Sequence, residues 1–151
     1  MTPAEADKLL SDNFAPWVLE LGLTVEELDD RRAVLRLPWS TRLAREGGGM
    51  SGPALMAGGV WAVTGTRAEA WGRAADPATE IAVPAARGGF VPMTTVQQST
   101  SFQRAVTDAD VLVEAVLGKL GRRMAFADIT MTAEGSTEFA ARASTVYALL
   151  G

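Results

Sequence analysis

Apolar and polar residues alternate in two short runs within the first third of the chain, 23–27 and 33–37. A polar turn, Asp29-Asp30-Arg31, separates the two runs, and Pro38 follows the second. Alternation with a period of two is typical of a strand with one buried face, so the pattern predicts an antiparallel hairpin. Pro38 ends the second strand, because proline has no N–H to donate to the ladder.

The last third of the chain combines strand-like runs with turns at about ten-residue intervals. The runs are 94–102, 111–117, 125–132 and 138–149. This spacing predicts an antiparallel meander of at least three strands. Gln97 and Gln98 fall in a strand that should be half buried. We expect one of them to face a pocket or an interface, where a buried amide needs hydrogen-bond partners.

Residues 54–73 form a mostly apolar stretch that predicts one long helix. A helix that is apolar nearly all round is a buried helix, so this one should lie in the core. A shorter helix is predicted at the N-terminus, beginning at Thr2-Pro3 and ending near 12 or 13. Thr2 is placed to act as its N-cap, and Glu5 stands three residues later, as a capping box requires.

Residues 74–92 contain three prolines and two glycines, at positions 77, 84, 92, 88 and 89. Both residue types interrupt regular structure, so this segment is predicted to be a long loop with at most one short strand. A loop of this length is often functional.

The predicted order is helix, hairpin, long helix and then at least three antiparallel strands. One long apolar helix must bury most of its surface, and one sheet is available to cover it. The sequence therefore predicts an α+β fold in which a curved antiparallel sheet wraps around one long central helix. No linker or internal repeat divides the chain, so we expect a single domain spanning 1–151.

The chain contains no histidine and no cysteine. This excludes the commonest general base, a thiolate nucleophile and a zinc–thiolate site. Catalysis would have to use carboxylates, hydroxyls, amides, backbone dipoles or water. The net charge is −4 and no basic block is present, which argues against nucleic-acid binding. No apolar run approaches the ~20 residues of a membrane span, and no signal peptide is recognisable, so we expect a cytoplasmic protein.

Several segments resemble the phenylacetate-pathway (PaaI-like) family of acyl-CoA thioesterases, which have the hotdog fold. The matching segments, in the family's order and spacing, are 14–17, 32–38, 48–57, 94–105, 121–127 and 141–147. None is diagnostic alone. The resemblance implies an acyl-CoA or aryl-CoA thioester as substrate and no cofactor. It also implies a homodimer or homotetramer with sites between subunits.

Thioester hydrolysis develops negative charge on the carbonyl oxygen, which amides at a helix N-terminus can stabilise. The family places a glycine amide at the turn before its helix, and Ser51-Gly52-Pro53 matches that turn. The resemblance thus implies that Gly52 supplies the oxyanion amide and that Ser51 lines the site. The alternative interpretation is that these residues only cap a helix, since proline suits a first helical turn.

The carboxylate that the family carries on its helix falls at Val60, which can neither accept a proton nor attack a carbonyl. No carboxylate occurs at 54–68, and Glu69 lies about 13 Å further along the helix. Glu46 precedes the turn, and we interpret it as a solvated loop charge. Val60 makes the expected pocket more apolar, which suits substrate binding.

Two hydroxyl residues match positions that line the family's site. Thr64 lies one helical turn after Val60, and Thr95 lies on a strand that the family contributes across the dimer. A threonine without a base is a poor nucleophile, and Thr95 has the alternative interpretation of an ordinary strand residue. Four arginines are candidates for binding the phosphates of coenzyme A, with solvation as the alternative: Arg45, Arg104, Arg122 and Arg123.

Three functions remain open. The first is a working acyl-CoA thioesterase with an unusual site. The second is a non-catalytic hotdog protein that binds an acyl-CoA or an aromatic ligand, which Val60 favours. The third is a hotdog dehydratase, which is weak because such enzymes normally need a histidine.

Overall fold

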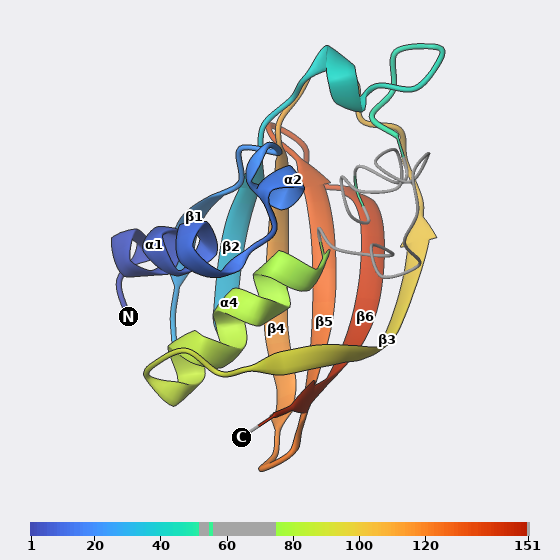
Figure 1. Cartoon of the computed structure of the whole chain (residues 1–151). Coiled ribbons are helices and arrows are strands. Elements are labelled where there is room, and N and C mark those ends of the chain that lie inside the picture. Colours follow the sequence, from blue (N-terminus) through green and yellow to red (C-terminus); the bar gives the residue numbers. More distant parts are fainter. Residues whose placement is uncertain (52–54, 56–74, 151) are drawn as a thin grey trace, which may run out of the picture.

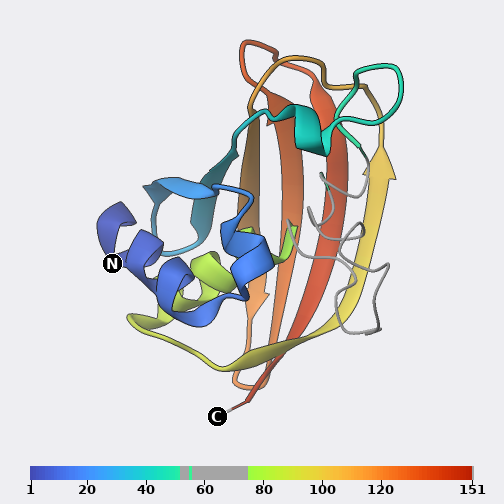
Figure 2. The same cartoon turned by 45° about the horizontal axis from the view of Figure 1, so that its top comes forward.

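The structure is a computed structural model, and it describes residues 1–51, 55 and 75–150. Six strands form one antiparallel sheet in the order β1-β2-β4-β5-β6-β3. The sheet curves around helix α4, as Figures 1 and 2 show. The elements are α1 (Pro3–Asn13), α2 (Pro16–Leu19), β1 (Thr24–Leu28), β2 (Arg32–Leu37), the 3-10 helix η1 (Thr41–Leu43), α4 (Ala75–Arg87), β3 (Met93–Phe102), β4 (Val111–Leu120), β5 (Met124–Ala133) and β6 (Phe139–Leu149).

The predicted hairpin and meander are confirmed. β1 pairs antiparallel with β2, whose residues Ala33, Leu35 and Leu37 are fully buried. β4, β5 and β6 follow one another as antiparallel neighbours. The capping box of α1 is also present, because Thr2 and Glu5 exchange side-chain and backbone hydrogen bonds. The α+β class with a curved antiparallel sheet around a helix is therefore confirmed.

The prediction of a loop at 74–92 is wrong, because α4 occupies 75–87 of it. Pro77 lies in the first turn, where a helix does not need the missing N–H. Pro84 lies inside the helix and has no N–H to donate to the carbonyl of Glu80. The burial of apolar side chains on one face of the helix outweighs the loss of this hydrogen bond. Ala78, Ile81 and Ala82 follow the i, i+3, i+4 pattern and are fully buried. The long helix predicted at 54–73 lies almost entirely outside the described residues.

α4 is joined to the sheet by a hydrogen bond inside the core. The hydroxyl oxygens of Thr79 on α4 and Thr145 on β6 lie 3.0 Å apart. Both residues are buried, at 0% and 1% exposure. A buried hydroxyl without a partner costs about 1–3 kcal/mol, so this contact fixes the rotation of α4 over the sheet.

Replacing Thr79 by valine is expected to lower the free energy of unfolding by about 1–3 kcal/mol, because Thr145 loses its partner. The double variant Thr79→Val/Thr145→Val should recover part of that loss, since neither hydroxyl is then left unpaired. Urea unfolding of both variants and of Thr79→Ser measures the difference. Additive losses in the double variant would contradict the pairing.

The two edges of the sheet differ in how they are protected. At the β1 edge, a carboxylate oxygen of Asp7 accepts a 2.8 Å hydrogen bond from the N–H of Val25, so α1 covers the strand. β1 also carries Glu26 and Glu27 and contains a bulge. β3, at the other edge, has no charged residue in its ten positions. Charge and cover normally prevent pairing between sheet edges, so within the described residues β3 is the less protected edge.

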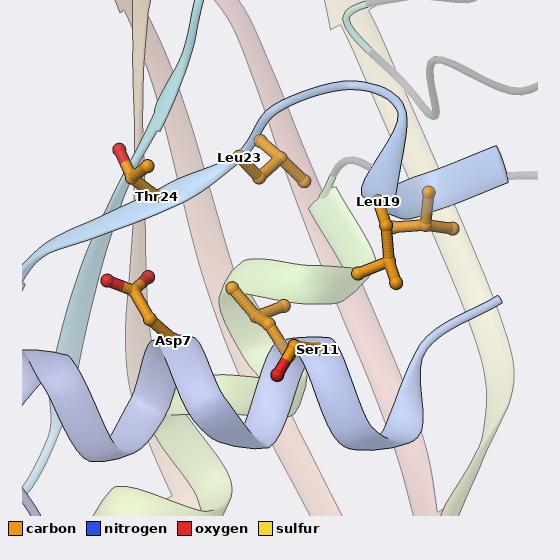
Figure 3. A pocket seen from close by; sticks show the side chains of 7 residues that line it. Asp7, Ser11, Leu19, Leu23 and Thr24 are labelled. Carbon is orange, nitrogen blue, oxygen red and sulfur yellow. The ribbon is translucent and has the colours of Figure 1, made fainter. Parts of the chain in front are cut away.

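A cavity of about 310 Å³ lies between α1, α2 and β1. Its wall is made by four apolar side chains, with Asp7, Ser11 and Thr24 at its polar side, as Figure 3 shows. The apolar residues are Leu10, Val18, Leu19 and Leu23. Asp7 is already engaged with the backbone of β1, so this cavity belongs to the packing of the N-terminal helices against the sheet.

Candidate functional site

The loop that precedes the predicted oxyanion turn is held by backbone hydrogen bonds. Ala44 and Met50 form an antiparallel bridge, and the glycines at 47 and 48 take positive φ angles of 91° and 81° between them. The N–H of Met50 donates to the carbonyl of Val106, 2.6 Å away, which ties the loop to the β3–β4 connection. Glycine adopts such φ angles without strain, so the glycine-rich sequence allows this tight turn.

Ser51 is fixed at the end of this loop. Its N–H donates to the carbonyl of Leu43 over 2.8 Å, and its carbonyl accepts from the N–H of Leu55 over 3.1 Å. The second bond has the four-residue spacing that opens an α-helix. Ser51 is 7% exposed. The structure thus places Ser51 where a helix N-cap belongs, as both interpretations of the turn require. Gly52, Val60 and Thr64 lie outside the described residues, so their predicted roles remain predictions.

Thr95 lies on the concave face of the sheet, half-buried on β3 and opposite the fully buried Tyr147 of β6. A bulge follows it at Val96, so the concave face continues at Gln98 rather than at Gln97. Gln98 pairs with Thr145, whose hydroxyl meets Thr79 of α4. Thr95 therefore belongs to a row of polar residues between α4, β6 and β3 that we call the polar strip: Thr79, Thr95, Gln98, Thr100, Thr145 and Tyr147.

Gln98 is the one of the two strand glutamines that lies in the polar strip. Both polar atoms of its amide are buried and find no hydrogen-bond partner among the described residues, and the same holds for the Thr100 hydroxyl. Gln97 is exposed on the opposite face. Gln98 is therefore the glutamine whose amide is buried, and its place at a pocket or an interface stays a prediction. Buried polar groups are normally satisfied, so these two groups are suited to receive a polar group of a ligand or of a second chain.

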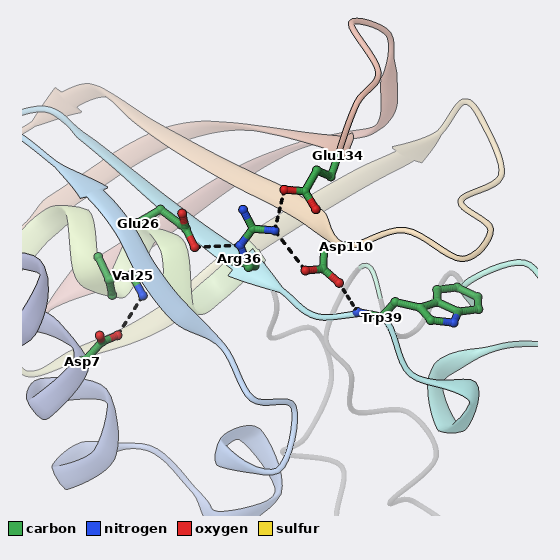
Figure 4. Close-up of polar contacts among 7 residues, drawn as sticks. All are labelled: Asp7, Val25, Glu26, Arg36, Trp39, Asp110 and Glu134. Carbon is green, nitrogen blue, oxygen red and sulfur yellow. Dashed lines mark hydrogen bonds and ion pairs between the residues drawn. The ribbon is translucent and has the colours of Figure 1, made fainter.

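A network of ion pairs and a backbone hydrogen bond holds the segment that follows β2 in place, as Figure 4 shows. This segment leads to the loop that contains Ser51. Arg36 forms ion pairs with Glu26, Asp110 and Glu134 at 2.7, 3.0 and 2.9 Å. Asp110 also accepts a 2.7 Å hydrogen bond from the N–H of Trp39. This backbone hydrogen bond, together with Arg36, holds the pKa of Asp110 below its usual value. The three carboxylates likewise raise the pKa of the Arg36 guanidinium.

Asp110→Asn is expected to lower the free energy of unfolding at pH 7 by roughly 1 kcal/mol, a modest amount because the site is partly solvated. The pKa of Asp110 is lower in the folded chain than in the unfolded one. Its contribution is therefore full above the unfolded value of about 3.9 and disappears as the pH falls through the folded value. Urea unfolding at pH 7 and pH 3 measures this; an equal loss at both values would contradict it.

The four predicted phosphate-binding arginines divide between opposite ends of the sheet. Arg45 lies in the loop before Ser51, and Arg104 lies in the β3–β4 connection, which the hydrogen bond from Met50 to Val106 ties to that loop. This end of the sheet is at the top of Figure 1. Arg104 is paired there with Glu138 at 2.7 Å, whereas Arg45 is exposed in the loop. Arg122 and Arg123 lie in the β4–β5 turn at the other end. The ten residues of β4 separate these ends by about 30 Å, so the four arginines form no single site within one copy.

Glu80 is a carboxylate on the wrapped helix that sequence reasoning missed. It is half-buried and lines a cavity of about 270 Å³ with Phe14, Phe90, Met93 and other apolar residues. Met93 precedes Thr95 on the concave face of β3. The apolar period of α4 would have revealed Glu80, had the prolines not suggested a loop. Glu46 is exposed, in agreement with its interpretation as a solvated charge.

A family model for the thioesterase superfamily matches residues 73–140, which include α4, β3, β4 and β5. Similar structures cover nearly the whole chain. A candidate thioesterase from Silicibacter sp. TM1040 is 25% identical, with a TM-score of 0.79 and coverage of 100% of this chain and 93% of that one. No curated protein matches the chain.

Two further structures have the same fold at lower identity. The PaaI protein of the phenylacetic acid degradation operon of E. coli is 13% identical, with a TM-score of 0.75 and coverage of 99% of this chain and 94% of that one. Zebrafish thioesterase superfamily member 2 is 17% identical, with a TM-score of 0.71 and coverage of 98% and 95%.

The family model matches 68 of the 151 residues, and the similar structures share the hotdog fold with this chain. The predicted hotdog fold is thereby confirmed. The matched residues of this superfamily include Thr95, Gln98 and Glu80 but not the turn at Ser51. Within the described part of the chain, no helix is long and apolar enough to cross a membrane. Nor does that part hold three acidic, histidine or cysteine side chains grouped as metal ligands would be.

Proposed function

We propose that this hotdog protein hydrolyses an acyl-CoA or aryl-CoA thioester. The observation that carries the proposal is the polar strip on the concave face of a thioesterase-superfamily sheet. Gln98 and Thr100 place buried polar groups there without partners among the described residues. A thioester carbonyl accepts hydrogen bonds from an amide N–H₂, and its developing charge strengthens them in the transition state.

The proposed site lies between two copies of the chain. β3 is an uncharged strand at an open edge, which suits antiparallel pairing with β3 of a second copy. Such pairing places the Ser51 end of one copy beside the Glu80 cavity of the other, because paired antiparallel strands run in opposite directions. Gly52 and Ser51 of one copy then supply the oxyanion turn, and Thr95 and Glu80 of the other reach the same substrate.

Glu80 is the proposed base in place of the acid missing at Val60. Its carboxylate stands on α4 beside a cavity that has both polar and apolar walls and extends to Met93. A half-buried carboxylate can take a proton from a water molecule, which then attacks the carbonyl carbon of the thioester. The C–S bond breaks, the proton goes to the departing thiolate, and a carboxylic acid and a free thiol result. No cofactor takes part in this reaction.

A panel of CoA thioesters, including phenylacetyl-CoA, tests the proposal with a dye that detects the released thiol. We expect turnover by the unmodified chain, and a loss of about 100-fold in kcat when Glu80 is replaced by glutamine. The variants Thr95→Val and Glu46→Gln are assayed in parallel. Glu46→Gln is the control, because Glu46 is an exposed carboxylate whose replacement should leave kcat unchanged. Turnover that survives Glu80→Gln unchanged would refute the role of Glu80.

The alternative function is binding of an acyl-CoA or aromatic ligand without hydrolysis. The observation that favours it is Val60, where the family resemblance implies an acid. A saturable affinity for phenylacetyl-CoA, with no thiol released by any variant, would establish this alternative. Location in the cytoplasm is part of either proposal and rests on the sequence alone.

A further inference from the structure

The first thirty residues carry an excess of negative charge. They contain eight of the 18 acidic residues and one of the 14 lysines and arginines, so their side chains sum to −7, against +3 for residues 31–151. Four of the eight carboxylates are paired with a lysine or arginine, namely Asp12, Glu20, Glu26 and Glu27. Asp7 belongs to the other four. Within the described part of the chain, no cation lies at ion-pair distance from its carboxylate.

Asp7 is half-buried on α1, and its carboxylate points toward β1, as Figure 3 shows. Its Oδ1 accepts the 2.8 Å hydrogen bond from the N–H of Val25. A carboxylate has about four lone-pair positions on its two oxygens, so this bond leaves most of the acceptor capacity unused. No donor among the described residues reaches Oδ2. A half-buried charge is costly without a counter-ion, so a cation bound beside Asp7 would stabilise it.

The packing of α1 and α2 against β1 leaves the cavity of about 310 Å³ beside this carboxylate. That volume is near the lower limit of roughly 300–1,000 Å³ for pockets that hold small molecules. Leu10 and Val18 are buried at its wall, whereas Leu19 is 39% exposed, so the wall reaches from the core to the surface. The Ser11 hydroxyl donates to the carbonyl of Lys8 over 2.8 Å within α1. Among the lining residues that the structure describes, Asp7 is the one with a charge.

We propose that this cavity binds a small amine with an apolar body, in its protonated ammonium form. The ammonium group donates to Oδ2 of Asp7, and the body lies against the apolar lining side chains. A hydrogen bond between two charged groups is stronger than one between neutral groups, so the charge of the ligand decides its selection. The excess of acids over residues 1–30 attracts a cation and repels a carboxylate or a phosphate. This inference goes beyond the proposed function and uses none of its residues.

Calorimetric titration with hexylamine hydrochloride at pH 7 tests the inference. Hexan-1-ol and hexanoate are titrated in parallel, because they have the same chain length and differ from the amine in charge. We expect saturable binding of hexylammonium, binding of hexan-1-ol that is weaker by about tenfold or more, and no binding of hexanoate. In Asp7→Asn the affinity for hexylammonium should fall about tenfold, which corresponds to ~1.4 kcal/mol. Asparagine keeps a carbonyl oxygen for the N–H of Val25, so this variant should fold.

Asp12→Asn is the matched control, because Asp12 lies on the same helix but is exposed, is paired with Lys8 and does not line the cavity. Its affinity for hexylammonium should equal that of the unmodified chain. Leu19→Trp tests the location of the site. Leu19 is an exposed lining residue, so an indole there occupies the cavity without disturbing the core, and binding should be lost. Urea unfolding of each variant shows that the fold is retained.

The inference is overturned if hexylammonium does not bind saturably, or if hexan-1-ol binds as tightly. Unchanged affinity in Asp7→Asn or in Leu19→Trp would also overturn it, and so would an equal loss in Asp12→Asn. Glu80→Gln is included because Glu80 is a second carboxylate that lines a cavity. A loss of binding confined to Glu80→Gln would place the amine in that other cavity and contradict the inference. None of these titrations depends on thioester hydrolysis, so they are independent of the proposed reaction.

Discussion

Replacing Gln98 by leucine is expected to stabilise the folded chain while lowering its activity. Both polar atoms of the amide are buried and have no hydrogen-bond partner among the described residues. An unpaired buried polar group costs about 1–3 kcal/mol, and leucine fills a similar volume without that cost. The free energy of unfolding should therefore rise by about that amount, which corresponds to roughly 2–12 °C in Tm for a chain of this size.

In the proposed site the same change removes a hydrogen-bond donor from the thioester carbonyl, so kcat/KM should fall about 100-fold. Thermal unfolding and the thiol-release assay measure the two effects on one sample. Gln97→Leu is the matched control, because Gln97 is exposed on the opposite face of the same strand and should change stability by less than about 0.5 kcal/mol. A Gln98→Leu protein that is less stable and fully active would contradict the role of the polar strip.

Placing two lysines on β3 is expected to convert the proposed dimer into monomers and to abolish most of the proposed activity. The substitutions Gln97→Lys and Ser99→Lys introduce charge at exposed positions of an edge strand that carries none. In an antiparallel pair of identical strands these charges would face like charges, which opposes pairing. Since the proposed site uses both copies, kcat/KM should fall about 100-fold or more with the dimer.

Sedimentation and the thiol-release assay, run at the same protein concentration, follow assembly and activity together. Thr107→Lys/Thr137→Lys is the control, because it adds the same charge at exposed loop positions away from β3. A β3 variant that remains dimeric would exclude this edge as the interface. A monomer with unchanged activity would show instead that each copy contains a complete site.

Most of the sheet is predictable from sequence, because its alternating pattern records which face is buried. Ala33, Leu35 and Leu37 illustrate this: every second residue is apolar, and each is fully buried. The loop prediction failed at α4 because Pro84 is a local signal against a helix. Ile81 and Ala82 are buried by packing against the rest of the fold, which the local sequence does not reveal. This burial outweighs the helical hydrogen bond that Pro84 cannot donate.

The candidate site is less predictable from sequence, because the register in which the strands pair decides which of its residues lie close together. Thr95 and Gln98 share a face only because a bulge at Val96 shifts the alternation by one residue, and no sequence signal marks that bulge. Arg122 and Arg123 are separated from Ser51 by the length of β4, which depends on where the strands pair. The chemical type of these side chains was enough to select them as candidates from the sequence. Which of them lie close together depends on how the strands pair, and this was known only from the structure.

We propose that the chain hydrolyses a CoA thioester without an acid at position 60. The most direct measurement is the steady-state rate of phenylacetyl-CoA hydrolysis by the unmodified chain and by Val60→Asp under identical conditions. We expect measurable turnover by the unmodified chain, lost in Glu80→Gln. Turnover only after Val60→Asp would contradict it, and would identify a hotdog protein that has lost its base and binds the thioester without cleaving it.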